Sequence, residues 1–516
     1  MTAGSKPLLR STLIVSFFTA FNGAFNYLTL VVLASRFGAG REMDAFFAAT
    51  TVPQLMTAVL MATLTLAFIP VFIEARTRDE ANAWKVASVL ANVIFLVLVL
   101  LASAGQIFAV DLVALTNPGF GGDTLALATS LFRYLILAAV FSATSLVLAG
   151  LHYSRQEFLR PSLAQGLNSL VTFLSVVFLG RVLGIRSVAV GTLAGSVLQF
   201  AFLLPVLLAR GRYSPSLDLR MKEVRRFAAV MLPLLAGSIF YKANAVVERF
   251  IASKLGESRV SYLGYAFKII SVLQLVMAQG LSTAILPRMS EQSAAGDTRA
   301  LRETVEKGIR ATLLVTVPVF VGLLCGATEV VRVVFERGDF RRPTTEAVAV
   351  ALAAYLGYFA VGVVAAPVLN AFYSLQKTAL VAVIGVAGFA FYVGLAFILV
   401  GPLSYPGIAL AISVQSLLSL AVMIVVLQRK VGEFAWRPIL ICLAKSGLGS
   451  GLAVLAVVAA RRLVGSWLGY PYDLLVFAAL GVAVYGFSLV LFRTEELSYL
   501  NLAGLFRRGR RVENIR

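Results

Sequence analysis

The sequence predicts an all-α integral membrane protein with about fourteen transmembrane helices, and three observations lead to that prediction. The chain of 516 residues is 59% hydrophobic, whereas soluble proteins are nearer to about 45–50% apolar. Runs of about twenty apolar residues, long enough to cross a bilayer as a helix, recur from end to end. The pattern of these runs occurs twice along the chain, as an internal repeat.

The duplication is visible in short segments that recur at an offset of about 218 residues. Each match falls at the end of an apolar run, and duplicated membrane halves are typical of transporters. Six spans per copy is an even number, so both copies are expected to enter the membrane the same way up, as a parallel repeat. The matching segments are Ala34–Gly38 with Ala252–Gly256, Ile69–Pro70 with Leu286–Pro287, and Tyr153–Gln156 with Tyr373–Gln376.

Each predicted span is an apolar run that ends at a polar or basic loop. The first copy is expected to contribute spans near 12–36, 43–73, 84–111, 124–152, 158–182 and 186–209. The second copy is expected at 226–254, 259–286, 305–326, 344–372, 378–400 and 405–428. Two further runs follow, at 437–462 and 470–492. The predicted organisation is an N-terminal six-helix lobe (1–213), a C-terminal six-helix lobe (214–430), and two extra transmembrane helices with a basic cytoplasmic tail (431–516).

The charge pattern predicts the orientation of the chain. Its net charge is +20, from 45 Lys and Arg against 25 Asp and Glu. The basic residues cluster in short loops after spans two, four, six, eight and twelve and in the C-terminal tail, which is the bias of cytoplasmic loops. Both termini are therefore expected in the cytoplasm. No aromatic stacking platform accompanies the basic clusters, so we expect no nucleic-acid partner.

The residue inventory argues against an enzyme. Two cysteines in apolar runs and a single histidine, His152, predict neither a disulfide framework nor a metal site. No phosphate-binding loop and no credible Ser-His-Asp set is present. We therefore expect no catalytic residue, no metal and no cofactor, and transport driven by an ion gradient, the membrane potential or the substrate's own gradient.

Polar residues inside the predicted spans are candidates for function, because such groups are costly in a membrane. Asn22 and Asn26 are four residues apart and share one face of the first span. Arg36 lies in the repeated segment that ends this span. Asp44 opens the second span, where it either caps that helix or serves a gate.

The seventh span carries the most charge. Lys242 and Arg249 share one face, and Asn244 and Glu248 share a neighbouring face. Lys268 lies in the eighth span. In one interpretation, Glu248 pairs with Arg249 or Lys268 and joins helices, or Arg249 and Lys268 extend to the membrane interface. In the other, these groups line a cationic cavity that attracts an anionic headgroup, with Arg able to bind phosphate through two hydrogen bonds.

Three stretches carry a family resemblance: Phe37–Gly40 with Asp44–Phe47 and Val52-Pro53, Leu286–Ser290 with Gly296-Asp297, and Phe335–Phe340. They resemble the MurJ/MviN lipid II flippases of the multidrug/oligosaccharidyl-lipid/polysaccharide exporter superfamily. The resemblance implies fourteen helices, two six-helix lobes around a central cavity, and a groove formed with the last two helices. It also implies cavity arginines that bind a diphosphate. At four such positions this chain has Gly23, Thr29, Thr57 and Lys268, whereas Asp44 matches the family's aspartate.

The resulting hypothesis is a flippase that moves a polyprenyl-diphosphate-linked saccharide from the cytoplasmic to the outer leaflet by alternating access. The peptidoglycan precursor lipid II is the first expectation, in a multi-pass protein of the bacterial cytoplasmic (inner) membrane. The expected partners are the undecaprenyl-diphosphate-linked glycan, membrane lipids, and sodium, protons or the membrane potential for coupling. The headgroup residues would be Lys242, Arg249, Lys268, Asn22 and Asn26, and the gating or coupling residues Asp44, Arg36, Glu248 and Asn244.

Three alternatives remain open at this point. A Wzx-like flippase would carry lipid-linked repeat units of an exopolysaccharide or O-antigen. A multidrug or cation antiporter of the same superfamily would need deep acidic residues, and Glu248 is the one convincing example. A non-transporting scaffold for an assembly complex would tolerate substitution of every cavity residue.

Overall fold

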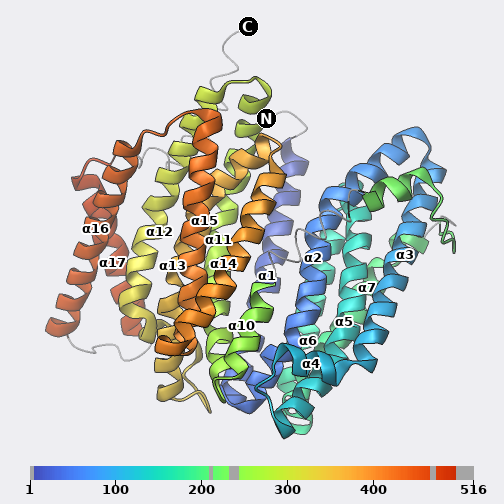
Figure 1. Ribbon diagram of the computed structural model, residues 1–516, viewed down its shortest axis with the longest axis horizontal. Helices are drawn as coiled ribbons and strands as arrows, with labels where there is room; N and C mark the ends of the chain where they lie inside the picture. Colours follow the sequence, from blue (N-terminus) through green and yellow to red (C-terminus); the bar gives the residue numbers. More distant parts are fainter. Residues whose placement is uncertain (1–4, 209–212, 230, 232–242, 465–471, 495–516) are drawn as a thin grey trace. The chain divides into compact units, whose positions relative to one another are not determined.

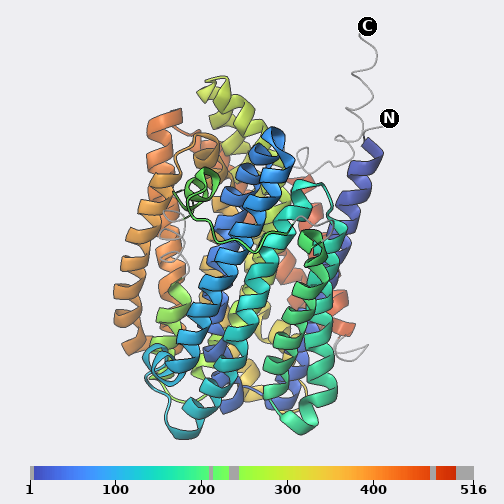
Figure 2. The same ribbon diagram turned by 90° about the vertical axis from the view of Figure 1, so that its right-hand side faces the viewer.

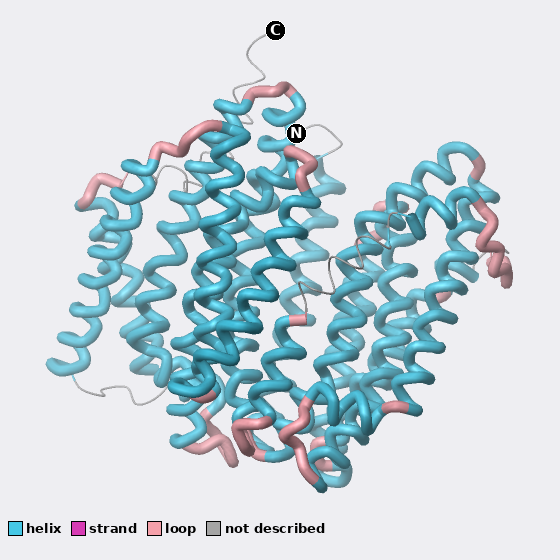
Figure 3. Tube along the Cα trace, in the orientation of Figure 1, coloured by secondary structure: helices cyan, strands magenta, loops and turns pink. Residues whose placement is uncertain are grey.

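The structure is a computed structural model that describes every residue except 1–4, 209–212, 230, 232–242, 465–471 and 495–516. In the described residues all regular secondary structure is helical, with no strand (Figure 3). The chain divides into two compact units. The first comprises Met1–Tyr262 and Phe335–Thr344, and the second comprises Leu263–Val334 and Thr345–Arg516. The predicted all-α class is confirmed.

The first unit contains the helices of the first copy of the repeat together with α10, which belongs to the second copy. Helix pairs α2–α5, α5–α7, α6–α7 and α1–α6 pack along their lengths, and both ribbon views show α2, α5 and α7 side by side (Figures 1 and 2). The helices are α1 (Ser5–Phe37), α2 (Arg41–Arg78), α3 (Glu80–Ile107), α4 (Ala109–Thr116), α5 (Gly122–Ser154), α6 (Leu159–Leu183), α7 (Arg186–Leu203), α8 (Pro205–Leu208) and α10 (Asn244–Ser253).

The second unit contains the remaining helices and has its own apolar core. Leu301, Val305, Val368, Phe372 and Leu427 are buried together in that core. Helix α14 packs against α15, and α16 packs against α17. The helices are α11 (Arg259–Ala294), α12 (Thr298–Phe335), α13 (Arg342–Ser374), α14 (Thr378–Leu403), α15 (Tyr405–Val431), α16 (Trp436–Val464) and α17 (Tyr472–Leu491).

The repeat predicted from the sequence recurs in the helix boundaries. Helices α5 and α13 both have 33 residues, and they begin at Gly122 and Arg342. Helix α3 ends at Phe108, where φ is −94° and ψ is 22°. Helix α12 has a non-helical residue at the corresponding point, Gly326, with φ −113° and ψ 16°. The first copy thus breaks into α3 and α4 where the second copy only kinks.

Two turns repeat with the same backbone conformation. Gln156 and Gln376 both have positive φ, 60° and 56°. Each follows a long helix, and each donates its N–H to the tyrosine three residues earlier, at 2.9 and 3.0 Å. Gly184 (φ 56°, ψ −139°) and Ser404 (φ 56°, ψ −143°) form the second matching pair. The two copies therefore fold alike down to individual turns.

The described residues contain fewer candidate membrane spans than the sequence predicts. Among the described residues, 12 helices are long and apolar enough to cross a membrane. The predicted spans 43–73 and 226–254 are not among them, and 226–254 lies partly outside the described residues. The exact count of fourteen is not confirmed. Most other boundaries agree within a few residues, for example 378–400 against Thr378–Leu403, but the predicted span 84–111 runs through the break at Phe108.

Candidate functional site

Asp44 lies in the first turn of α2 and is 1% exposed. Its carboxylate accepts the backbone N–H groups of Ser258 at 2.6 Å and Ser261 at 2.7 Å, and also the Ser261 hydroxyl. These N–H groups are at the start of α11, where a helix has no internal acceptors for them. Asp44 therefore caps α11, which belongs to the second copy. The predicted cap on its own helix is wrong, since α2 begins at Gly40 without a side-chain cap.

Glu248 and Arg249 form a buried ion pair on α10. The guanidinium lies 3.0 Å from the Glu248 carboxylate, and the two side chains are 7% and 9% exposed. Arg249 also donates to the carbonyl of Val260 at 2.9 Å and lies over the ring of Phe47 at 5.5 Å. It is close enough to Asp44 to interact electrostatically. The interpretation in which Glu248 pairs with Arg249 and joins elements is therefore present in this structure.

A reciprocal contact joins the ends of the two copies, and we call its residues the latch: Ser35, Gly119, Ser253, Gly338 and Asp339. A Cβ atom built on Gly338 would clash with the carbonyl oxygen of Ser35, and one built on Gly119 would clash with that of Ser253. The Asp339 N–H donates to the Ser35 carbonyl at 2.9 Å, and the Gly119 N–H donates to the Ser253 hydroxyl at 3.2 Å. Each copy thus packs its glycine on the other copy's serine.

Arg36 binds α1 to α6. Its guanidinium donates to the carbonyls of Val176 at 2.5 Å and Val177 at 3.1 Å. Gly180 leaves room for it, because a Cβ there would clash with the guanidinium. Arg36 thus fixes the end of α1 that carries Ser35 of the latch. Its predicted gating role is not tested by these contacts.

Asn22 and Asn26 lie on one face of α1, as predicted, and hydrogen-bond to α6. The Asn26 amide donates to the Asn22 side-chain oxygen at 3.0 Å and to the Ser169 hydroxyl at 3.1 Å. The Ser169 hydroxyl in turn donates to the Asn22 side chain. Asn26 is exposed and Asn22 half-buried. Their contact with a headgroup remains a prediction.

The described residues do not test whether the predicted cations lie together. Lys268 is exposed on the part of α11 that belongs to the second unit, whereas Arg249 belongs to the first unit. Lys242 lies outside the described residues. Asn244 begins α10, and its side-chain oxygen is buried and has no hydrogen-bond partner among the described residues. Within the first unit, the structure brings Asp44, Glu248 and Arg249 together.

The latch was missed by reasoning from the sequence. Gly119 and Gly338 lie at matching places in the two copies, as do Ser35 and Ser253. Aligning the loops as well as the spans would have revealed both pairs. That the loops cross to the opposite copy is information that only tertiary structure supplies.

Comparisons with known proteins give a consistent picture. The family profile described as "Lipid II flippase MurJ" matches residues 33–477. The lipid II flippase MurJ of Burkholderia cenocepacia is 27% identical over 393 residues, which is 73% of this chain and 76% of that protein. The probable lipid II flippase MurJ of Vibrio cholerae is 26% identical over 444 residues, with 81% and 82% covered.

The fold has solved relatives. A lipid II flippase MurJ in an inward closed conformation superposes with a TM-score of 0.81 at 20% identity, covering 94% of this chain and 100% of that one. An inward-facing multidrug resistance MATE family transporter of the MOP superfamily gives a TM-score of 0.69 at 17% identity, with 80% and 94% covered. At these identities the likeness concerns the fold alone.

Proposed function

This chain belongs to the MurJ family of lipid II flippases, and we propose from that premise that it moves lipid II from the cytoplasmic to the outer leaflet by alternating access. It is a transporter and not an enzyme. The observation that carries this function is the family match over residues 33–477. The MATE transporters share the fold, but the family match favours a lipid-linked glycan over a drug or a cation.

The chain is a multi-pass protein of the bacterial inner membrane, and we propose that both termini lie in the cytoplasm. The basic loops support this orientation. It places the end of α1, the start of α5 and the start of α11 on the outer side. The lobes expected at 1–213 and 214–430, with 431–516 as the extra element, are retained as part of the proposal.

The latch and Asp44 would then form an outer gate. Both join segments of the two copies at the ends that this orientation places outside. Closing the gate requires the glycine–carbonyl contacts, the cap on α11 and the pair of Glu248 with Arg249. Opening it would release Ser258 and Ser261 from Asp44, so the conformational change would exchange these buried contacts for hydration. In this scheme Asp44, Arg36, Glu248 and Asn244 keep the gating roles predicted for them.

The headgroup site remains a proposal. Lys242, Arg249 and Lys268 would bind the diphosphate, and Asn22 and Asn26 would contact sugar or peptide. Each charge-assisted hydrogen bond to a phosphate is worth roughly 1.5–3 kcal/mol, so three cations would contribute roughly 5–9 kcal/mol to binding of the diphosphate. Arg249 reaches the substrate only after its contacts with Glu248 and Val260 open. The coupling source, sodium, protons or the membrane potential, is likewise part of the proposal.

The test of the substrate is a flipping assay in proteoliposomes that contain the full chain. Three cargoes are compared: fluorescent lipid II, an undecaprenyl-diphosphate-linked O-antigen repeat unit, and a lipophilic drug cation. We expect lipid II to become accessible to an external enzyme or quencher and the other two to remain at the protein-free level. Flipping of the repeat unit but not of lipid II would overturn the proposal.

The site assignment has its own test. Lys242→Gln combined with Arg249→Gln is expected to abolish flipping while leaving folded protein in the membrane. Arg181→Gln is the matched control, because Arg181 is an exposed arginine in the last turn of α6. Unchanged flipping by the double variant would remove Lys242 and Arg249 from the headgroup site.

A further inference from the structure

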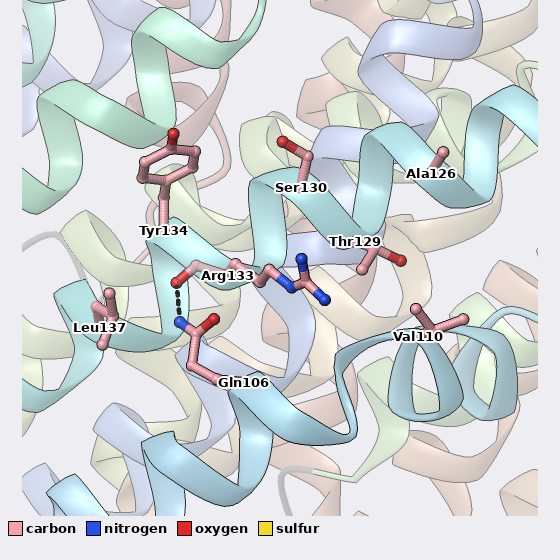
Figure 4. Close-up of a pocket in the computed structure, with 8 residues that line it drawn as sticks. All are labelled: Gln106, Val110, Ala126, Thr129, Ser130, Arg133, Tyr134 and Leu137. Atoms are coloured by element: carbon pink, nitrogen blue, oxygen red, sulfur yellow. Dashed lines mark hydrogen bonds between the residues drawn. The ribbon is translucent and has the colours of Figure 1, made fainter.

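A cavity of about 450 Å³ opens on the first unit beside the break between α3 and α4. One stripe of α5 lines it with Ala126, Thr129, Ser130, Arg133, Tyr134 and Leu137, and Gln106 and Val110 complete it (Figure 4). The cavity exists because the chain leaves the helical path at Phe108, so α4 does not continue the line of α3. None of these residues belongs to the gate or to the predicted headgroup site.

The cavity holds hydrogen-bond donors that have no acceptor. Thr129 is 6% exposed, yet its hydroxyl oxygen has no hydrogen-bond partner among the described residues. Figure 4 shows the Arg133 guanidinium extending along the cavity toward Thr129 and Val110. Within the part of the chain that the structure describes, no carboxylate pairs with the Arg133 guanidinium, and the Arg133 backbone carbonyl accepts the Gln106 amide at 2.7 Å. Buried polar groups are normally satisfied, and the exposed Arg133 guanidinium adds a positive charge near the buried Thr129 hydroxyl, so the cavity suits an anionic, acceptor-rich ligand.

The depth of Arg133 identifies where such a ligand comes from. Helix α5 has 33 residues, a length of about 50 Å, against a hydrocarbon thickness of about 30 Å. If the helix is centred, roughly 10 Å projects at each end. Arg133 is eleven residues after Gly122, so it lies only about 6 Å inside the hydrocarbon. An arginine at this depth reaches the level of the lipid phosphates.

An apolar surface continues from the cavity toward the middle of the membrane. Leu96, Val97, Leu100 and Leu101 on α3 are 43%, 48%, 60% and 52% exposed. Leu137, on the cavity stripe of α5, is 38% exposed. A ligand with a phosphate at Arg133 would therefore have its acyl chains against leucine and valine. We propose that this cavity binds the headgroup phosphate of an anionic glycerophospholipid in the outer leaflet, through Arg133 and Thr129.

The repeat shows that the fold does not need these donors. At the positions of α13 that correspond to Thr129, Ser130, Arg133 and Tyr134, the second copy has Ala349, Val350, Ala353 and Ala354. Those four residues occupy a helix of the same length with the same boundaries. The polar stripe is therefore an addition to the first copy and not a requirement of helix packing.

The test replaces Thr129 and Arg133 with alanine, which is the residue at the corresponding positions of the second copy. Thr129→Ala combined with Arg133→Ala is expected to fold normally and to bind dioleoylphosphatidylglycerol at least about tenfold more weakly. Binding is measured by native mass spectrometry of the full chain released from detergent. The control is Arg181→Ala. Arg181 is an exposed arginine in the last turn of α6 and does not line the cavity. This variant should bind phosphatidylglycerol like the unmodified chain.

Two further ligands separate the possible sources. Dioleoylglycerol, which has the same acyl chains without phosphate, should bind equally to all three proteins. Inorganic phosphate should not compete with the phospholipid at equal concentration. Equal phosphatidylglycerol binding by the double variant and the control would overturn the proposal. So would competition by inorganic phosphate alone. Circular dichroism of the double variant shows whether lost binding reflects lost fold.

Discussion

The two copies of the repeat share their helices but not their polar residues. Helices α5 and α13 correspond residue for residue, yet Arg133 in one is replaced by Ala353 in the other. The buried pair Glu248 and Arg249 in α10 corresponds to Leu30 and Val31 in α1, which are both buried. What the copies share therefore specifies the fold, and where they differ the chain holds the charged groups to which we assign proposed functional roles.

The residues of the proposed gate show the same division between shared and differing contacts. Asp44 caps the start of α11, but the corresponding residue of the second copy is Tyr262, which offers no carboxylate to α2. The latch, in contrast, is reciprocal, because both copies supply a glycine and a serine carbonyl. The proposed outer gate thus combines a symmetric backbone contact with an asymmetric set of charged residues.

The largest expected change in stability comes from replacing Arg249 of the second copy with valine, the corresponding residue of the first copy (Val31). Arg249→Val breaks the buried pair and should lower the free energy of unfolding by about 3–5 kcal/mol. The double variant Glu248→Leu with Arg249→Val removes both charges and should be close to the unmodified chain in stability. Thermal unfolding in detergent measures both. Equal destabilisation of the single and double variants would show that the pair is not the relevant interaction.

Removing the asymmetric cap should have the next largest effect. Asp44→Ala removes the acceptor of two backbone N–H groups and one hydroxyl, and should cost about 3 kcal/mol because buried donors are then unsatisfied. Asp111→Ala, an exposed acid on α4, is the control and should change stability by less than about 0.5 kcal/mol. Chemical unfolding followed by tryptophan fluorescence compares them. If the two variants lost equal stability, the cap would be unimportant.

A smaller loss of stability is expected from substituting a glycine of the latch. Gly338 (φ 61°) and Gly296 (φ 70°) both have positive φ, but only Gly338 lies against another segment's backbone. Gly338→Ala should therefore cost about 2 kcal/mol more than Gly296→Ala, through overpacking. Melting temperatures of the two variants give the difference. A larger loss for Gly296→Ala would argue against the latch.

The smallest expected effect concerns the turn that the copies share. Gly184 and Ser404 adopt the same backbone conformation with φ 56°, which favours glycine. Ser404→Gly should stabilise the chain by about 1 kcal/mol, and Gly184→Ser should destabilise it by a similar amount. The pair of melting temperatures should move in opposite directions. Shifts of the same sign would mean that the turns are not equivalent.

Sequence reasoning reached the helices because hydrophobic runs and their duplication are local patterns. It also brought Glu248 and Arg249 together as one of two interpretations. It missed the helix that Asp44 caps, since a carboxylate at the start of α2 gives no sign that its hydrogen-bond donors lie at the start of α11. It also passed over Arg133, an ionisable residue within a predicted span. Comparing the spans residue by residue would have marked it, because the second copy has Ala353 there.

The central claim is that lipid II crosses only when the two copies separate at the latch. The most direct measurement introduces Ser35→Cys and Asp339→Cys with Cys325→Ser and bridges the two new thiols with a short, reducible bifunctional reagent in proteoliposomes. Bridging Arg41→Cys to Asp123→Cys, whose native side chains meet at 3.1 Å within the first copy, is the control. We expect the first bridge to stop lipid II flipping until a reductant is added and the second to leave it unchanged. Full flipping with the latch bridged, as verified by mass spectrometry, would contradict the account.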